Sequence, residues 1–289
     1  MKTILAAMFF FLVQFPLFAQ VTISFPKGEA GFPRDMTPRD TLDYAYLNAH
    51  YCQLVRENKS DPDTLTKSEM MLQIGKQMSR YSNYTYWISD SIKADELKRP
   101  ELSLASIFNQ YFARTYKAGD KGVLLKNYPK GQCLFQKEIL INEYVYTEDM
   151  PVFDWTFMPD TLRVLGYLCK KATCSFRGRD YTAWYAPDIP LSNGPWKFNG
   201  LPGLILKVED ADWDYSFECT ALYRVGWKSP IYLSKRKKDI ETTREKFRQA
   251  EKAAMNNPNA VIGNSGLVTV PKGEKIVTKI LPYNPIELE

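Results

Sequence analysis

The chain has 289 residues, of which 45% are hydrophobic and 25% charged, and its formal net charge is +5. This is the composition of an ordinary globular protein, and it excludes collagen-like and extensively disordered chains. The single histidine, His50, excludes most histidine-based metal sites and catalytic triads, and we expect it to be a satisfied polar residue at the surface. So small a positive charge also argues against nucleic-acid binding.

Residues 1–19 read MKTILAAMFFFLVQFPLFA, with one basic residue, an apolar run and a small residue at the end. This pattern predicts a secretory signal peptide that is cleaved after Ala19. No cysteine follows the cleavage site to accept a lipid, and the apolar run is too short to span a bilayer. We therefore expect an exported mature chain, residues 20–289, that has no transmembrane segment and is periplasmic, outer-membrane-associated or secreted.

The first half of the mature chain predicts strands interrupted by one helix. Residues 42–55 alternate as in a strand but fit one face of a helix equally well. Residues 70–88 alternate more clearly and predict a strand pair. Residues 102–116 follow Pro100 with apolar side chains at helical spacing, which predicts a helix inserted between strands.

The second half predicts an antiparallel sheet followed by a helix. A strand region spans 133–146, and turn signals separate four further strand segments, at 165–176, 181–185, 204–208 and 215–223. Residues 234–256 predict a helix with Ser234 as its N-cap. A tail, 257–289, follows it, and its residues 263–289 are compatible with one or two edge strands. The predicted fold is mainly β with added helices (α+β). It is one domain with a single open, curved antiparallel sheet or partial barrel, a helical insertion and a C-terminal helix.

Five cysteines follow the predicted signal peptide: Cys52, Cys133, Cys169, Cys174 and Cys219. An odd number leaves at least one thiol unpaired, and the sequence does not decide the connectivity of the others. A bridge between Cys169 and Cys174 is rejected because five residues along one strand separate the two α-carbons too widely.

Residues 194–205, GPWKFNGLPGLI, resemble the naming motif of the GLPGLI family, secreted proteins widespread in Bacteroidetes. Other stretches follow the family's order and spacing, namely 72–75 with Ser79, 160–161, 166–172, 176–179, 183–185 and 189–190. The resemblance covers about 70–223 and departs from the family pattern at Leu168 and Cys174. It implies an exported, β-rich protein and no catalytic residue, because the family has no established activity.

The motif itself has a structural interpretation. In Leu201-Pro202-Gly203-Leu204, proline suits the second position of a type II turn, and glycine accepts the positive φ of the third. We therefore expect a structural motif made of Gly200, Leu201, Pro202, Gly203, Leu204 and Ile205.

Three alternating carboxylates, Asp210, Asp212 and Asp214, are a weak candidate for a calcium site. An EF-hand loop starting at Asp210 would need glycine where Tyr215 stands and glutamate where Ala221 stands. A solvated hairpin loop accounts better for the three residues, and we expect neither a metal nor a cofactor.

Aromatic side chains gather between 181 and 217, and four of them are candidates for a ligand-binding surface: Trp184, Tyr185, Trp196 and Phe198. Alternation in the strand 181–185 places Trp184 and Tyr185 on opposite faces, so one face needs a cover. The predicted C-terminal helix has a narrow apolar stripe that is too small to hide Trp184 and Trp196 together. A ring left exposed would suit a glycan, lipid or peptide.

These features favour a non-enzymatic envelope protein that binds a ligand or protein partner, whose identity the sequence does not give. The alternative is a hydrolase that needs no histidine, such as a glycoside hydrolase with two carboxylates drawn from Asp180, Asp188, Glu209 and Glu218. A cysteine nucleophile with His50 as its base has no supporting motif.

Overall fold

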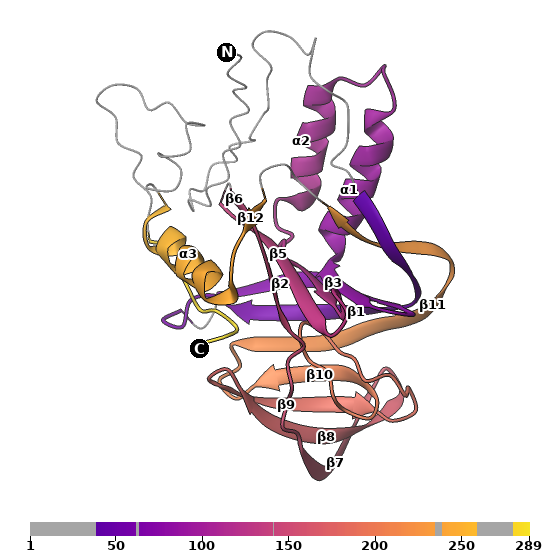
Figure 1. Cartoon of the computed structure of the whole chain (residues 1–289), viewed down its shortest axis with the longest axis vertical. Helices are drawn as coiled ribbons and strands as arrows, with labels where there is room; N and C mark the ends of the chain where they lie inside the picture. The colour runs from indigo at the N-terminus through magenta and orange to yellow at the C-terminus, as the bar shows by residue number, and fades with distance from the viewer. Residues whose placement is uncertain (1–38, 62–63, 141, 235–238, 259–279) are drawn as a thin grey trace.

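The computed structural model describes residues 39–61, 64–140, 142–234, 239–258 and 280–289 (Figure 1). The predicted signal peptide and most of the predicted edge strands in the tail lie outside these residues, and 280–289 contain no strand. No helix among the described residues is long and apolar enough to span a membrane.

The described residues form one sheet of twelve strands with the order β12-β6-β5-β4-β3-β2-β1-β11-β10-β9-β8-β7. All neighbours are antiparallel except β12 and β6, which are parallel. The strands are β1 (Arg39–Arg56), β2 (Leu65–Gly75), β3 (Ser79–Asn83), β4 (Val123–Lys126), β5 (Gln132–Ile139), β6 (Asn142–Asp149), β7 (Thr156–Val164), β8 (Tyr167–Phe176), β9 (Arg179–Ala186), β10 (Leu204–Asp210), β11 (Tyr215–Ser234) and β12 (Ile240–Glu241). The prediction of a mainly β chain with one large open sheet and added helices is confirmed.

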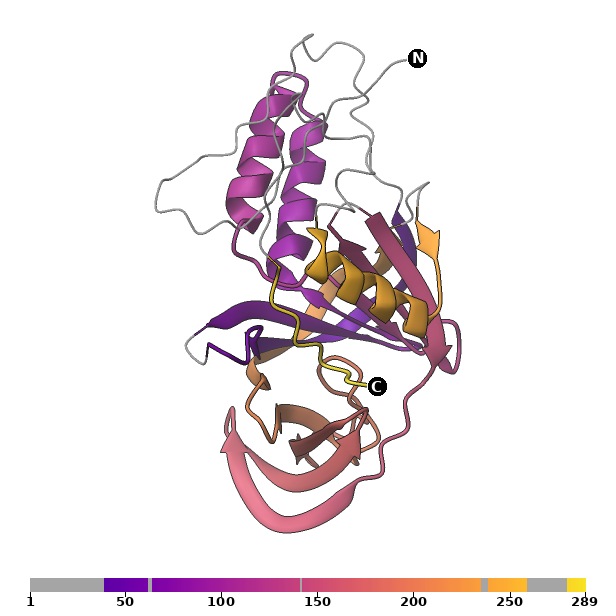
Figure 2. The same ribbon diagram turned by 90° about the vertical axis from the view of Figure 1, so that its left-hand side faces the viewer.

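The sheet is strongly curved, as the arched ribbons of β8 and β9 show in Figure 2. This curvature brings together parts of the sheet that are distant in the strand order. Arg177, in the β8–β9 turn, forms an ion pair with Glu148 of β6, with Nη2 2.5 Å from Oε2. The loop between β9 and β10, residues 187–203, contributes Trp196, Phe198 and Leu201 to the main core cluster, packed with residues of β1, β8, β9, β10 and β11. We call residues 187–203 the motif loop.

Within the described part of the chain, three helices accompany the sheet: α1 (Tyr84–Leu97), α2 (Leu104–Thr115) and α3 (Arg244–Asn256). The inserted helix α2 confirms the prediction for 102–116. The prediction of strand beyond Asn83 is wrong, because the Asn83 side chain accepts a hydrogen bond from the backbone N–H of Tyr86 and caps α1. The alternation of aromatic residues in this stretch therefore does not reflect a strand.

The C-terminal helix begins later than predicted. Its N-cap is Thr243, whose hydroxyl accepts a hydrogen bond from Lys246 N, whereas Ser234 ends β11. Phe247 and Ala254 of α3 pack with Ile139 and Tyr146, on β5 and β6. The motif loop, and not α3, covers the face of β9 that carries Tyr181. The centres of the Phe198 and Tyr181 rings lie 4.9 Å apart.

The predicted type II turn is wrong in its geometry. Gly203 is absent from the glycines with positive φ, whereas Gly200 has a φ of +92°. The backbone N–H of Gly203 instead donates to Leu201 O at 2.9 Å, the pattern of a γ-turn around Pro202. Glycine is required at 203 for lack of space, because a Cβ there would lie 2.7 Å from the carbonyl carbon of Ala186.

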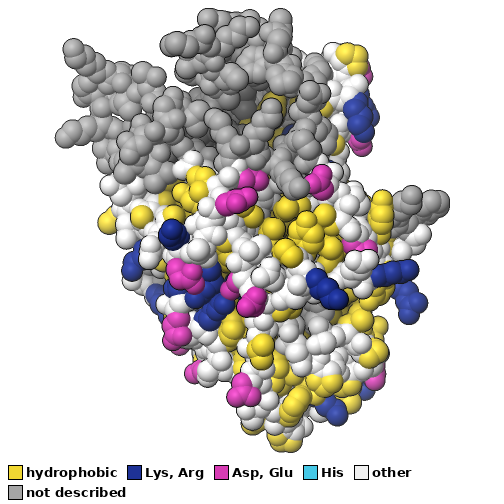
Figure 3. Space-filling view, in the orientation of Figure 1, with side chains coloured by type: hydrophobic (Ala, Val, Ile, Leu, Met, Phe, Trp, Pro, Cys, Tyr) yellow, Lys and Arg dark blue, Asp and Glu magenta, His cyan; other side chains and the backbone are white. Residues whose placement is uncertain are grey.

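Charged side chains of both signs gather on the surface beside α3 and the C-terminal end (Figure 3). The C-terminal residues 280–289 pass from α3 toward the curved β8–β9 region (Figure 2). We call these residues the C-terminal segment.

Candidate functional site

The structure buries three of the four aromatic residues predicted to bind a ligand. Tyr185, Trp196 and Phe198 belong to the main core cluster. Trp184 lies on the opposite face of β9 and is half-buried, with Lys171 Nζ 5.7 Å from the centre of its ring. Of the four side chains, only Trp184 is not fully buried, and it packs against the same core cluster.

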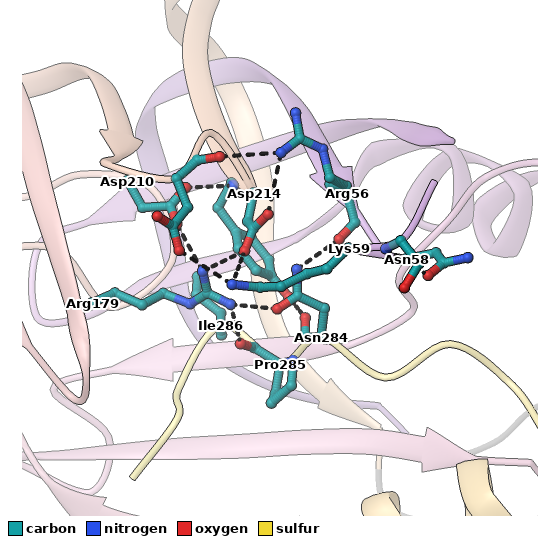
Figure 4. A network of polar contacts seen from close by, with 12 residues as sticks. Arg56, Asn58, Lys59, Arg179, Asp210, Asp214, Asn284, Pro285 and Ile286 are labelled. Carbon is teal, nitrogen blue, oxygen red and sulfur yellow. Dashed lines mark hydrogen bonds and ion pairs between the residues drawn. The ribbon is translucent and has the colours of Figure 1, made fainter. Parts of the chain in front are cut away.

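The three aspartates considered for calcium do lie together, with ligand atoms within 4.8 Å of one another. Figure 4 shows Asp210 and Asp214 directed at the guanidinium of Arg179. Arg179 Nη1 lies 2.7 Å from Asp210 Oδ2 and 3.0 Å from Asp214 Oδ2, and all three side chains are 2% exposed. These aspartates are therefore buried ion-pair partners, and the prediction of a solvated loop holds only for the exposed Asp212.

Cations surround the three aspartates. Lys59 Nζ lies 2.8 Å from Asp214 Oδ2 and 3.2 Å from Asp212 Oδ2, and Arg56 Nη1 lies 3.5 Å from Asp214 Oδ1. With Arg179, three cations balance three carboxylates. Burial alone would raise the pKa of Asp214, but hydrogen bonds from Lys59 and Arg179 outweigh it and lower the pKa. Calcium would have to displace these cations to bind.

The same arginine holds the backbone of the C-terminal segment. Arg179 Nη2 donates to Asn284 Oδ1 at 2.6 Å and to Pro285 O at 2.8 Å. Tyr215 Oη donates to Asn284 O at 2.5 Å, and Tyr181 Oη donates to the carbonyl of residue 286 at 3.1 Å. Three consecutive carbonyl groups of the segment thus accept hydrogen bonds from side chains of β9 and β11.

Glu287 of the C-terminal segment enters a second cluster of charges. Its carboxylate lies 2.5 Å from Lys197 Nζ, 2.6 Å from Arg177 Nη1 and 2.8 Å from Arg244 Nη1. Glu148 completes the cluster through ion pairs with Arg177 and Lys197. We call these five residues the Glu287 cluster.

Three elements far apart in the chain supply the cations of the Glu287 cluster. Arg177 lies in the β8–β9 turn, Lys197 in the motif loop and Arg244 at the first residue of α3. Burial alone would raise the pKa of Glu287, but Lys197 and Arg177 outweigh it and hold the pKa below its usual value. Without Glu287, three cations would face the single carboxylate of Glu148, so the site attracts a negative charge.

Two further bonds hold the segment, because Asn284 Nδ2 donates to Arg56 O at 2.7 Å and the backbone N–H of Leu288 donates to Arg177 O at 2.9 Å. The residues that make these contacts with positions 284–288 form what we call the tail-binding surface: Arg56, Arg177, Arg179, Tyr181, Lys197, Tyr215 and Arg244. The sequence patterns did not predict this surface. The available signal was local, because Arg177 and Arg179 flank a turn glycine, and Lys197 stands between the aromatic residues Trp196 and Phe198. A lysine in such an apolar context needs a buried partner.

The remaining candidate residues are not among those of the tail-binding surface. Glu209 and Glu218 come together on β10 and β11, where Lys207 Nζ lies 3.2 Å and 3.6 Å from their carboxylates. Asp180 bonds Ser175, and Asp188 is exposed. His50 lies on β1 with its Nε2 2.8 Å from Tyr223 Oη, and burial lowers its pKa.

The five cysteines are free thiols in the structure, and all but Cys52 are buried. Cys169 and Cys174 both lie on β8, as predicted. Burial raises the pKa of Cys133 to about 11 and that of Cys174 to about 12, which keeps these thiols protonated near neutral pH.

Residues 175–207 match a family model described as "Protein of unknown function (Porph_ging)". No curated protein matches the chain. Two solved structures of PNGF-II, in the P21 and C2 space groups, are similar with TM-scores of 0.45 and 0.46 at 13% identity. Each match covers 70% of this chain and 32% of the other, so this chain spans about a third of the length of those structures. The matched family segment contains Arg177, Arg179 and Lys197 of the tail-binding surface, and its description names no activity.

Proposed function

We propose that the chain is an exported, non-enzymatic binding protein whose tail-binding surface holds an extended, acidic peptide segment. In the structure, the chain's own residues 284–288 occupy that surface. The partner in the envelope is then a protein segment with a carboxylate that takes the place of Glu287. Membership of the GLPGLI family would fit this role but does not specify the partner.

The observation that carries the proposal is the mode of recognition of the C-terminal segment. Three successive backbone carbonyls are bound by side-chain donors, and one carboxylate is bound by three cations. Main-chain bonds give affinity for any extended segment, while a charge-assisted site selects an acidic side chain. The surface is therefore suited to a class of peptide rather than to a metal ion.

The experiment places the C-terminal segment in trans. A protease site is inserted within 259–279 of the full chain, the purified protein is cleaved, and a fluorescent peptide of residues 280–289 is added. We expect a saturable rise in fluorescence anisotropy as the labelled peptide replaces the cleaved segment. A peptide with Glu287→Gln should bind about tenfold more weakly, because it lacks the charge that faces Lys197, Arg177 and Arg244.

The control peptide carries Glu289→Gln, which changes an exposed side chain and should bind as the natural sequence does. A Lys197→Met protein tests the other side of the contact, and the peptide variants keep the test decisive if that protein does not fold. The proposal is wrong if the labelled peptide does not exchange into a cleaved protein whose circular dichroism is unchanged. Equal binding of the two glutamine peptides would contradict selection for an acidic side chain.

A hydrolase that needs no histidine stays a prediction. The two acids that do come together, Glu209 and Glu218, share Lys207 as a partner.

A further inference from the structure

A pocket of about 170 Å³ lies beside the motif loop, away from the C-terminal segment. Its walls come from the hairpin turn between β2 and β3, the end of β4 and the motif loop. Asn193 Nδ2 of the loop donates to Ser79 Oγ of β3 at 3.0 Å and joins two of these walls. Its lining contains Lys76 and Lys126 and no acidic side chain.

Lys126 is the unusual residue of this pocket. It is 2% exposed, and its ammonium donates to the carbonyl oxygen of Gly194 at 2.6 Å. Among the residues that the structure describes, no carboxylate forms an ion pair with it. Buried ammonium groups are normally paired because the loss of hydration is costly. Lys126 therefore lacks the counter-charge that Lys197 obtains from Glu148 and Glu287.

Two serine hydroxyls of the lining are also available as donors. Ser79 Oγ accepts a hydrogen bond from Asn193, and Ser192 Oγ accepts one from the backbone N–H of Gly200. A hydroxyl that accepts one bond still has its own hydrogen to donate. The lining therefore offers two ammonium groups and two hydroxyl groups as donors.

We propose that this pocket binds a small oxyanion, a carboxylate or a phosphate-type group, with Lys126 as its counter-ion. The donor set fits anionic oxygens, and no acidic side chain lines the pocket. The nearby carboxylate of Asp43, on β1, accepts hydrogen bonds from the backbone N–H groups of Gln77 and Met78 at the hairpin turn. The volume suits a ligand of only a few non-hydrogen atoms or the charged end of a larger one. This inference is independent of the tail-binding surface.

Ligand binding should be coupled to proton uptake. Burial lowers the pKa of Lys126 to about 7, and an anion next to its amine would raise this pKa again. The ionisable groups that face it are Cys133, its partner across β4 and β5, and Lys76 at the hairpin turn. Ser79 faces it from β3, and neutral polar groups face it from the motif loop. The Cys133 thiol stays neutral because its pKa is about 11.

The test titrates sodium sulfate and sodium acetate separately into the full chain by calorimetry at pH 8. Sulfate stands in for a phosphate-type group and acetate for a carboxylate, and neither titrates near this pH. Repeating each titration in two buffers of different ionisation enthalpy measures the protons taken up. We expect saturable binding of at least one anion, at millimolar or lower concentration, with uptake approaching one proton per site.

Lys126→Met should weaken this binding roughly tenfold or more, whereas Lys170→Met, which removes an exposed lysine on β8, should leave it unchanged. If Lys126→Met does not fold, two other measurements carry the test. One is proton uptake by the unmodified protein, and the other is the anion affinity of Ser192→Ala, which should fall a few fold. Absence of saturable binding of both anions at tens of millimolar would overturn the proposal. So would equal affinity in Lys126→Met, or binding without proton uptake.

Discussion

The Nζ atom of Lys197 in the motif loop lies 2.5 Å from Oε1 of Glu287, ninety positions later in the chain. This contact joins the segment that matches a family model to the C-terminal segment, and both side chains are buried. The motif loop therefore has two roles in the fold, since it fills the core with Trp196 and Phe198 and binds the end of the chain with Lys197.

Breaking this pair should destabilise the protein strongly. Lys197→Met leaves Glu148 and Glu287 with less positive charge in a buried site, and we expect a loss of about 3–5 kcal/mol in the free energy of unfolding. The measurement is urea denaturation followed by circular dichroism. Lys98→Met is the control, because the Lys98–Asp95 pair is exposed and its removal should not change the melting temperature measurably. Equal stability of Lys197→Met and the unmodified protein would contradict the buried pair.

The contribution of Glu287 should disappear in acid. Its pKa in the folded state lies below its usual value of 4.5, so the unfolded chain takes up a proton at higher pH than the folded one. The stabilisation is therefore complete above about pH 5 and is lost as the pH falls through the folded pKa. We expect the difference in unfolding free energy between the unmodified protein and Glu287→Gln to shrink between pH 5 and pH 3. A difference independent of pH would show that the Glu287 carboxylate is not held as an anion.

Gly203→Ala should destabilise the fold by steric overlap. A methyl group at 203 would meet the backbone of Ala186 and Pro187, and we expect a cost of about 1–3 kcal/mol. Gly226→Ala is the matched control, because nothing lies within 4 Å of a Cβ there and its φ is not positive. Thermal melts of the two variants compare them directly, and similar melting temperatures would show that the backbone at 186–187 can move away.

The two tryptophans of the predicted ligand surface should differ in their effect on stability. Trp196→Ala removes a core ring that packs edge-to-face on Phe176 and Phe198, and we expect it to cost about 3–5 kcal/mol. Trp184→Ala removes a half-buried ring on the outer face of β9 and should cost about 1–2 kcal/mol. Denaturation curves of both variants provide the measurement. If Trp184→Ala is as destabilising as Trp196→Ala, no ring of the predicted surface is available to a ligand.

Much of the strand pattern follows from the sequence because alternation is a local property. The alternation in 181–185 places Tyr181, Ala183 and Tyr185 on the buried face of β9, with Trp184 opposite. Helix α2 is likewise recognisable from its apolar spacing. Helix α1 is not, because its aromatic residues also alternate and its start depends on the cap at Asn83.

The partners of the charged groups, unlike the strands, do not follow from local sequence patterns. The sequence shows three aspartates at 210–214 but does not show that Arg179, thirty-one residues earlier, neutralises Asp210. The spacing of the aspartates predicted a solvated loop at 210–214. The pairing of β9 with β10 instead buries the ion pair of Arg179 with Asp210. The same reason explains Gly203, whose requirement for glycine comes from the neighbouring chain at Ala186 rather than from its own turn.

The sequence by itself determined a β-rich chain with an inserted helix and a C-terminal helix, because periodicity and composition act over a few neighbours. Only the tertiary structure decided which charged and polar groups meet. Arg177 and Glu287 are 110 positions apart, and Lys126 and Gly194 are 68 apart. Such contacts depend on how the curved sheet closes around the motif loop, and local sequence patterns do not show which partner each side chain meets. Burial gives these charges their energetic weight, since a buried charge must be neutralised by a partner that the fold brings to it.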